Sequence, residues 1–386
     1  MSEHTAPFDL LRLDDELTAD QRAYRDRIRA FVDCEVLPCA GEAYDQGQFP
    51  SAWLKGLAEL GVMEMFVKGD PDPVLYGLAS RELERGGGPL RSTVSVQGSL
   101  AMTAIALFGS DEHKAQWIGP LSKLDAIGCF CLTEPRFGSN PSGMETYATR
   151  TSTGFKLNGH KRWATNATLA QVAVIWAKLD DQVRGFVVET GRPGVVVKPI
   201  KHKWSFRASE SAEIELNGVD LPESALLPGT RSLGSALKCL NSARYGIAWG
   251  MVGAAAACLE ETLAYLGNRP QFAGKPLTSH QLVQNKLAWM AVELAGMDLM
   301  VRRLAELRSR GQLDPVQVSM AKMNNCRKAL DIARSCRDLL GADGITLEHH
   351  VGRRMVDLET VVTYEGTEHI HALIIGQHLT GHSAFA

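Results

Sequence analysis

Apolar residues in the first third of the chain recur at the spacing of amphipathic helices. Tyr24, Ile28 and Phe31 share one helical face, behind a capping-box pattern that begins at Thr18. Pro38 is expected to end this first helix, because proline cannot continue the hydrogen bonding of a helix interior. Further helices are predicted at residues 51–61, 74–85, 91–108 and 111–118.

The pattern changes in the middle of the chain. Residues 172–177 form an almost wholly apolar run, and the segments 184–189, 194–200 and 211–221 follow it, separated by Gly, Asn and Pro. Short apolar runs bounded by such residues are typical of strands joined by turns. Residues from about 125 to 230 are therefore predicted to form a β-barrel or β-sandwich domain.

The last third is helical again and carries a heptad pattern. Its apolar positions step by four and three residues, which favours packing at a shallow angle, as in a four-helix bundle. A single buried core helix would show the same pattern, so the repeat supports a bundle without proving an oligomer. The positions are Val283, Leu287, Met290, Leu294, Met297, Val301 and Leu304.

The length of the chain agrees with a division into parts. A chain of 386 residues exceeds the roughly 250–300 residues at which a single core stops growing. We expect an α+β multi-domain protein. Its predicted parts are an N-terminal helical domain at 1–124, a central β domain at 125–235 and a C-terminal helical bundle at 236–386.

Composition narrows the functional classes. Hydrophobic residues make up 45%, charged residues 22%, and the net charge is −3, which argues against a nucleic-acid partner or an anionic membrane surface. No apolar run approaches the roughly 20 residues of a membrane span, and the acidic N-terminus has no signal-peptide core. The eight cysteines are scattered, and the pair Cys129 and Cys131 has no second pair at zinc-ligand spacing. We expect a cytoplasmic protein with reduced thiols and no metal site.

Two polar segments near the start of the β region could bind a cofactor. In the segment CFCLTEPRFGSNPSGMET, Thr133, Gly138 and Ser139 offer hydroxyl and exposed N–H groups that can bind a flavin edge or a phosphate. In NGHKRWATNA, Trp163 can stack on a planar ring and Thr165 can hydrogen-bond to it. Taken separately, a polar loop and a core tryptophan are the more ordinary explanations.

A third segment, TYEGTEHIHAL, lies close to the C-terminus. It places Glu365 between an aromatic ring and a glycine, with two histidines just downstream. An acid in such a bend is either part of a solvated turn or a base directed at a substrate. The residue types by themselves leave both explanations open.

Together these segments resemble the acyl-CoA dehydrogenase family, and within it the chain is most similar to the glutaryl-CoA dehydrogenases. The resemblance covers nearly the whole chain, and the family's fold matches the predicted helical, β, helical order. It rests on six segments in a fixed order. They are LTEPRFGSNPSGMET, GHKRWATNA, CLNSARYGIAWG, NRPQF…HQLVQNKLA, NNCRKALDIARSCRDLLGADGI and TYEGTEHIHALIIG.

The resemblance implies an FAD cofactor between the β domain and the C-terminal bundle, with its adenosine half reaching a neighbouring subunit. Trp163 would lie against the flavin ring, Thr165 near its N5 edge and Thr367 close to the cofactor. The residues implied to hold the ring are Phe130, Leu132, Thr133, Gly138 and Ser139. Those implied to reach the FAD of the other subunit are Arg269, Phe272, Gln281, Asp338, Gly341 and Ala342.

The same resemblance implies that Glu365 is the catalytic base. It would remove an α-proton from an acyl-CoA thioester while the β-carbon passes hydride to the flavin, and the N–H of Glu365 or Gly366 can bind the thioester oxygen. Some family members carry the base just before the arginine of NSARYG, but this chain has Ala243 there, so Glu365 has no rival. Arg244 is left as a contact for the substrate or for the loop that holds it.

The segment RELERGGGPLRSTVSVQGS resembles the part of glutaryl-CoA dehydrogenases at the far end of the acyl pocket. A guanidinium such as that of Arg91 can bind both oxygens of a free γ-carboxylate. The charged run from Arg81 to Arg85 is equally well explained as a solvated helix face. The implied substrate contacts are Glu84, Arg91, Ser92, Ser95, Ser139, Arg244, Tyr364 and Gly366.

Several positions depart from the family pattern. Asn140 stands where family members usually carry Asp, and His369 stands where an acid is common. Ala273 looks like a one-residue insertion, GAD at 341–343 replaces a Gly-Gly pair, and the loop at 68–73 is shortened. The differences at 273 and 342 affect the segment expected to contact the partner's FAD. The shortened loop at 68–73 affects the prediction of the acyl substrate.

The expected function is oxidative decarboxylation of glutaryl-CoA to crotonyl-CoA and CO2, with electrons passed to an electron-transfer flavoprotein. A homotetramer, built as a dimer of dimers, is expected. One alternative is a non-decarboxylating dehydrogenase with another acyl group or a carrier-protein thioester. Another is a binding protein that kept the fold and lost FAD, against which the retained Glu365, Thr133 and Trp163 argue.

Overall fold

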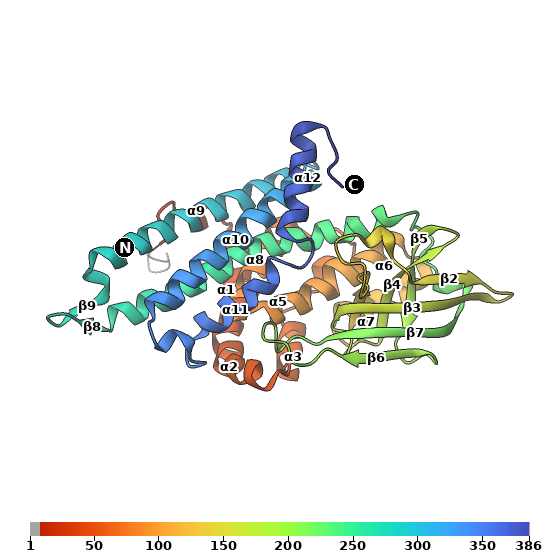
Figure 1. The fold of residues 1–386 in the computed structure, drawn as a ribbon, viewed down its shortest axis with the longest axis horizontal. Helices are drawn as coiled ribbons and strands as arrows, with labels where there is room; N and C mark the ends of the chain where they lie inside the picture. The colour runs from red at the N-terminus through yellow and green to blue at the C-terminus, as the bar shows by residue number, and fades with distance from the viewer. Residues whose placement is uncertain (1–7, 386) are drawn as a thin grey trace.

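Two helical regions flank a β region in the computed structural model, which describes residues 8–385 (Figure 1). This order is the one that the sequence predicts. The first region contains α1 (Ala19–Phe31), α2 (Leu37–Gln46), α3 (Ser51–Glu59), α4 (Pro73–Gly86), α5 (Gly88–Val94), α6 (Thr103–Phe108) and α7 (Asp111–Ser122). The β region contains β1 (Gly128–Cys131), β2 (Tyr147–Arg150), β3 (Gly154–Thr165), β4 (Val172–Leu179), β5 (Gln182–Glu189), β6 (Val195–Pro199) and β7 (Ser211–Pro222). The last region contains α8 (Leu233–Gly267), β8 (Pro270–Gln271), β9 (Lys275–Pro276), α9 (Gln281–Ser309), α10 (Pro315–Leu339), α11 (His350–Val361) and α12 (Glu368–Thr380).

The first helix begins as predicted but does not end at Pro38. Gln21 N donates to Thr18 Oγ1 over 3.2 Å, which forms the capping box. A π-helical turn over Val32–Val36 leads directly into α2, and Pro38 lies in the first turn of α2. The expected break is therefore wrong. The proline follows the wider π-helical turn, whose altered hydrogen-bond spacing accommodates the N–H that proline lacks.

A second π-helical segment, Ser95–Met102, joins α5 to α6. The sequence predicts one helix over 91–108, and the structure confirms a continuous helical path that contains this wider turn. Every residue of the segment is buried, and it packs against both α8 and β1. The segment thus connects the N-terminal helices to both the β region and the C-terminal bundle. Because it follows α5 directly, it determines which side of α5 faces the interior.

The seven strands form one mixed sheet in the order β1-β4-β2-β3-β7-β6, with β5 also paired to β4. Strand β4 explains the apolar run in the sequence. Val172, Val174 and Trp176 belong to the core shared with the helices, whereas Ala173 and Ile175 belong to a separate core within the sheet. Side chains alternate between the faces of a strand, so a strand with a core on each side is apolar throughout.

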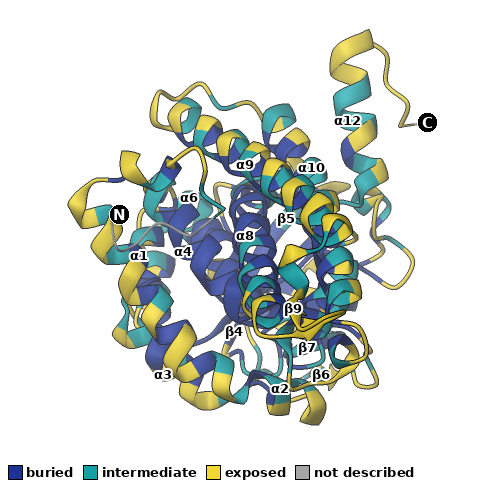
Figure 2. Cartoon of the chain, turned by 90° about the vertical axis from the view of Figure 1, so that its left-hand side faces the viewer, coloured by how far each residue is buried: buried dark blue, intermediate teal, exposed yellow. Residues whose placement is uncertain are grey.

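The central element of the helical part is α8, which Figure 2 shows with α4 at the buried centre, surrounded by helices with exposed outer faces. By length and composition α8 could span a membrane, with a mean hydropathy of 1.2 in its most apolar window. Because 72% of that window is buried inside the protein, α8 has the character of a core helix.

Five of the seven predicted heptad positions of α9 are buried, whereas Val283 and Leu287 in its first two turns are half-buried. The buried five are Met290, Leu294, Met297, Val301 and Leu304. Between α8 and α9 the short hairpin of β8 and β9 extends from the end of the bundle. Figure 1 shows this hairpin at the opposite end of the molecule from the β region. Residues of the hairpin and of the β sheet therefore cannot meet within one chain.

Candidate active site at the junction of α11 and α12

Glu365 lies in a sharp turn between two helices. α11 ends at Val361, and Thr367 caps α12 by accepting a hydrogen bond from Ile370 N over 3.2 Å. Glu365 has a φ of 55° and Gly366 a φ of 95°. A left-handed backbone is unfavourable for a residue such as glutamate, and backbone strain of this kind clusters at functional sites.

The carboxyl group of Glu365 is available to accept a proton. Its Oε2 atom is buried and has no hydrogen-bond partner among residues 8–385. Burial raises the pKa of this carboxyl above its ordinary value, while the cations of Arg244, Lys322 and Arg91 oppose that rise. A desolvated and unpartnered carboxylate has the properties of a general base.

The neighbouring residue, Tyr364, connects this turn to Arg91. The Arg91 Nε donates to Glu84 Oε2 over 2.5 Å, and its NH2 donates to the Tyr364 hydroxyl. Arg91 and Glu84 are each only 2% exposed. The structure therefore brings together Glu84, Arg91, Tyr364 and Glu365, as the sequence predicts, from three different elements.

The charged run at 81–85 is divided between two faces of α4. Arg81, Glu82 and Arg85 form ion pairs with residues of the N-terminal segment, α1 and α8. All three are buried, so the explanation as a solvated helix face is wrong. Glu84 alone of the four charged residues turns toward Arg91.

The two serines assigned near Arg91 are both buried, each with 4% exposure. The Ser95 hydroxyl lies 3.2 Å from that of Ser99, so its hydrogen-bonding partner is on the next turn of the helix. Ser139, in contrast, lies in the exposed loop after β1 together with Gly138. Ser92 and Ser95 are thus buried on the same helical path as Arg91, whereas Ser139 lies apart from them in an exposed loop.

A loop of the β region covers Tyr364, and sequence reasoning missed it. Phe206 N donates to Asp357 Oδ1 over 2.6 Å, and the Phe206 ring meets the Tyr364 ring edge-on with 5.7 Å between centroids. Burial raises the pKa of Asp357 to about 6. The contact joins residues 151 positions apart, and neither residue lies in a motif that could have identified it.

The two predicted flavin segments lie side by side. Arg162 N donates to Thr133 O over 2.8 Å. The register between β3 and β7 shifts next to Arg162, and this β-bulge coincides with a φ of 61° at Trp163. Bulges often turn a side chain toward an active site. The Trp163 ring is 52% exposed, which suits a stacking surface for a planar ring.

These flavin segments are also tied to α5. Asn166 Nδ2 donates to Thr93 O over 3.1 Å, which joins the end of β3 to α5 close to Arg91. The buried Lys161 donates to Glu134 Oε1 over 2.8 Å and anchors the loop after β1. Phe130 and Leu132 are buried behind this loop, and Thr165 is half-buried. The residues present therefore fit a flavin ring placed against Trp163.

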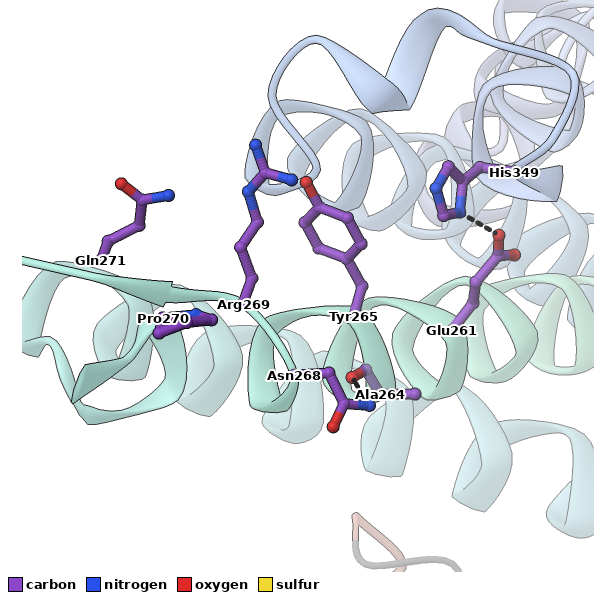
Figure 3. A pocket seen from close by; sticks show the side chains of 8 residues that line it. All are labelled: Glu261, Ala264, Tyr265, Asn268, Arg269, Pro270, Gln271 and His349. Carbon is purple, nitrogen blue, oxygen red and sulfur yellow. Dashed lines mark hydrogen bonds and ion pairs between the residues drawn. The ribbon is translucent and has the colours of Figure 1, made fainter. Parts of the chain in front are cut away.

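The remaining predicted cofactor residues lie at the far end of the bundle, around the β8–β9 hairpin. Arg269 forms an ion pair with Asp343 at 2.9 Å, Asp338 pairs with Lys286, and Phe272 is 80% exposed. Gln281, Gly341 and Ala342 are exposed as well. A cavity of about 680 Å³ opens here, lined by Glu261, Tyr265, Arg269, Gln271 and His349 among others (Figure 3).

Cysteine positions give no sign of metal chemistry. Cys129 and Cys131 are buried in the sheet core with their Sγ atoms 3.7 Å apart. Across residues 8–385, no three His, Cys, Asp or Glu side chains gather as potential metal ligands.

Comparison with known proteins decides the family. Models of the N-terminal, middle and C-terminal domains of acyl-CoA dehydrogenases match residues 18–125, 129–219 and 233–380. The chain belongs to the acyl-CoA dehydrogenase family. It is therefore an FAD-dependent oxidoreductase that acts on CH–CH bonds of acyl-CoA substrates.

The proteins similar to this acyl-CoA dehydrogenase are named for substrates with different acyl groups. A crystal structure of glutaryl-CoA dehydrogenase from Mycobacterium smegmatis is 48% identical, with a TM-score of 0.95 and coverage of 98% of this chain and 99% of that one. A crystal structure of a glutaryl-CoA dehydrogenase from the same organism, in complex with FADH2, is 45% identical, with a TM-score of 0.96 and coverage of 99% of this chain and 100% of that one. The short-chain specific acyl-CoA dehydrogenase of Bos taurus mitochondria is 33% identical, covering 94% of this chain and 91% of the bovine protein.

Proposed function

We propose that the protein oxidises glutaryl-CoA to crotonyl-CoA and CO2. The observation that carries this proposal is the buried guanidinium of Arg91, held by Glu84 and by Tyr364 beside Glu365. A buried arginine next to the base suits a short acyl chain that ends in a carboxylate. The high similarity to glutaryl-CoA dehydrogenase structures supports the same substrate.

In the proposed reaction Glu365 takes the α-proton of the thioester. The turn offers the N–H groups of Glu365 and Gly366 to the thioester oxygen, where negative charge develops. FAD, when bound, accepts the hydride that leaves the β-carbon. The resulting glutaconyl-CoA loses CO2 and leaves a dienolate that the thioester carbonyl delocalises, and protonated Glu365 returns its proton to give crotonyl-CoA.

Arg91 has two opposed tasks in this scheme. It must orient the γ-carboxylate, yet an ion pair that is too tight would stabilise the charge that has to leave as neutral CO2. Glu84 and Tyr364 both hydrogen-bond the guanidinium and so compete with the substrate for it. That competition would weaken the pairing enough for the carboxylate to leave.

The proposal is tested by anaerobic titration of the purified protein with a panel of acyl-CoA thioesters, while the flavin absorbance is followed. Glutaryl-CoA should bleach the flavin most readily, and mass spectrometry should find crotonyl-CoA and CO2 in equal amounts. Accumulated glutaconyl-CoA would identify a non-decarboxylating enzyme. Bleaching by butyryl-CoA in preference to glutaryl-CoA would favour the short-chain alternative, which the bovine relative suggests.

Gly250 of α8 provides a prediction about acyl selectivity. A Cβ at this position would lie 2.9 Å from Glu84 Oε2 and 3.5 Å from Arg91 Cδ, so the buried pair would have to move. We expect Gly250→Ala to lower kcat/KM for glutaryl-CoA by roughly 10- to 100-fold, because misplacement of an orienting group by about 1 Å has effects of this size. Activity with butyryl-CoA, which has no γ-carboxylate, should fall much less.

A matched control is available in the same helix. Gly267 of α8 has open space where a Cβ would lie, so Gly267→Ala tests the effect of an added methyl group on the helix itself. It should leave the ratio of glutaryl-CoA to butyryl-CoA activity unchanged. An unchanged ratio in Gly250→Ala would show that the Glu84–Arg91 pair does not select the substrate.

We also propose a homotetramer built as a dimer of dimers. The predicted FAD residues divide between the two ends of the molecule, so one chain cannot use both sets for one cofactor, and a second copy would have to supply the hairpin end. An electron-transfer flavoprotein is the proposed electron acceptor, and the cytoplasm the proposed location. The electron acceptor follows from the family, and the location is consistent with the bacterial relatives from Mycobacterium smegmatis.

Arg269→Ala should release FAD and loosen the dimer together, since an arginine at this end would clamp the pyrophosphate of the other subunit's cofactor. Absorbance of the flavin after gel filtration measures the first effect, and elution volume the second. Arg303→Ala removes another exposed arginine that pairs with an acid on the bundle and should change neither. Full FAD retention in Arg269→Ala would contradict the shared site.

A further inference from the structure

Lys322 of α10 holds the turn that carries Glu365. Its Nζ donates three hydrogen bonds to the carbonyl oxygens of Val361, Tyr364 and Gly366, at 3.0, 2.9 and 2.8 Å. Burial lowers the pKa of Lys322 from its ordinary value, but an amine donates three hydrogen bonds only when it is protonated, so the three carbonyls favour the charged form. The side chain is 1% exposed. Buried lysines usually pair with a carboxylate, whereas Lys322 donates its hydrogen bonds to backbone carbonyls.

Arg244 of α8 supplies a second cation to the same turn, because its Nε donates to Glu365 O over 2.7 Å. The described peptide bonds are all trans, so the C=O and N–H of one peptide unit point in opposite directions. The Tyr364 carbonyl shares a peptide unit with the Glu365 N–H, and the Glu365 carbonyl shares one with the Gly366 N–H. Both N–H groups therefore point away from the cations, and within residues 8–385 neither donates to a protein acceptor.

We propose that Lys322 and Arg244 are positioning residues that polarise these two peptide units and thereby strengthen the N–H donors for the thioester oxygen. A hydrogen bond accepted by a carbonyl increases the donor strength of the N–H in the same unit, by roughly 10–30% per bond for neutral chains. Charged donors act more strongly than neutral ones. The inference rests on the thioester chemistry of the proposed function and is independent of the glutaryl group.

His371 closes the space around the turn without adding charge. A Cβ at Gly366 would lie 3.0 Å from the His371 Nε2, so the ring is packed against the turn. Burial, together with the cations of Lys322 and Arg244, lowers the pKa of His371 to about 3. The histidine is therefore neutral at physiological pH. The two cations remain the charged groups that hydrogen-bond the carbonyls of the turn.

The test compares wild-type holoenzyme with Lys322→Met, which keeps the length of the side chain and removes the charge. Bound crotonyl-CoA, which is already unsaturated and does not reduce the flavin, carries a 13C-labelled thioester carbonyl and is observed by difference infrared spectroscopy. Binding of the enolate of acetoacetyl-CoA is followed by its ultraviolet band. In the wild type the carbonyl stretch should move to lower frequency than in water. In Lys322→Met much of this shift should be lost, and the enolate should bind more weakly by on the order of tenfold, less than for removal of a whole oxyanion donor.

Lys328→Met is the matched control, since Lys328 lies on the same helix and pairs with Glu293 at the surface. This variant should retain the wild-type stretching frequency of the thioester carbonyl and the wild-type affinity for the enolate. If Lys322→Met does not fold, Lys322→Gln keeps a donor without charge and should give the same direction of change. A folded Lys322 variant with wild-type frequency and enolate affinity overturns the inference. Absence of any shift in the wild type would instead count against the proposed function.

Discussion

Replacing Glu365 with glutamine is expected to lower turnover by at least ~10²–10⁴-fold, the range typical of a positioned general base. Glutamine keeps the shape and polarity of the side chain but cannot take a proton. FAD content and thioester binding should stay close to wild type, because the carboxyl Oε2 has no hydrogen-bond partner within residues 8–385. Stopped-flow measurement of flavin bleaching with the best acyl-CoA provides the rate.

The pH dependence of the same step gives an independent check. Burial raises the pKa of Glu365, and the base must be deprotonated to act. The wild-type rate should therefore rise with pH through a value above that of an ordinary glutamate, and Glu365→Gln should lose this rise. Glu359→Gln, which changes a surface acid of α11 paired with Arg334, should leave the profile intact. Near wild-type bleaching in Glu365→Gln would place the base elsewhere.

Arg91→Gln should affect glutaryl-CoA far more than butyryl-CoA. Only glutaryl-CoA has a carboxylate that would lose its partner, and removing one partner of a buried, hydrogen-bonded charge pair costs roughly 2–5 kcal/mol. The ratio of kcat/KM for the two substrates measures this difference directly. Butyryl-CoA also serves as the internal control, because any general damage to the fold or to FAD binding lowers both activities.

Equal losses on both substrates would mean that Arg91 does not anchor the carboxylate. The glutaryl assignment would then lose the observation that carries it, while membership of the acyl-CoA dehydrogenase family would be unaffected. Product analysis of the residual activity adds a second criterion. Glutaconyl-CoA formed by Arg91→Gln would show that this arginine helps the carboxylate to leave as well as to bind.

Local patterns in the sequence were sufficient for much of the fold. The apolar run at 172–177 predicts a strand, and β4 owes that run to two cores that face it from opposite sides. Pro38 shows the limit of such reasoning. Whether a proline ends a helix depends on its place in the turn, and the π-helical turn before it could not be read from residue type.

The supporting parts of the site were less accessible to sequence reasoning. Lys322 and Lys328 are six positions apart on one helix and look alike in the sequence, yet the first is 1% exposed and the second 30%. Tertiary packing decides which of them is buried. Phe206 and Asp357 likewise meet only after the β region folds against α11. The residues that resemble a family motif were predicted, and those that hold the motif in place were not.

The π-helical segment Ser95–Met102 has a consequence for how acyl recognition can change in this fold. In an α-helix each residue turns the side chains by about 100°, and a π-helical turn holds extra residues within the same helical path. Deleting one residue from the segment would therefore let a regular helix form and rotate α5 by roughly 100° about its own axis relative to α6. Arg91 would swing away from Tyr364 with no side chain altered. If Arg91 anchors the substrate carboxylate as proposed, substrate choice depends on the rotation of α5 about its axis as well as on the identity of its residues.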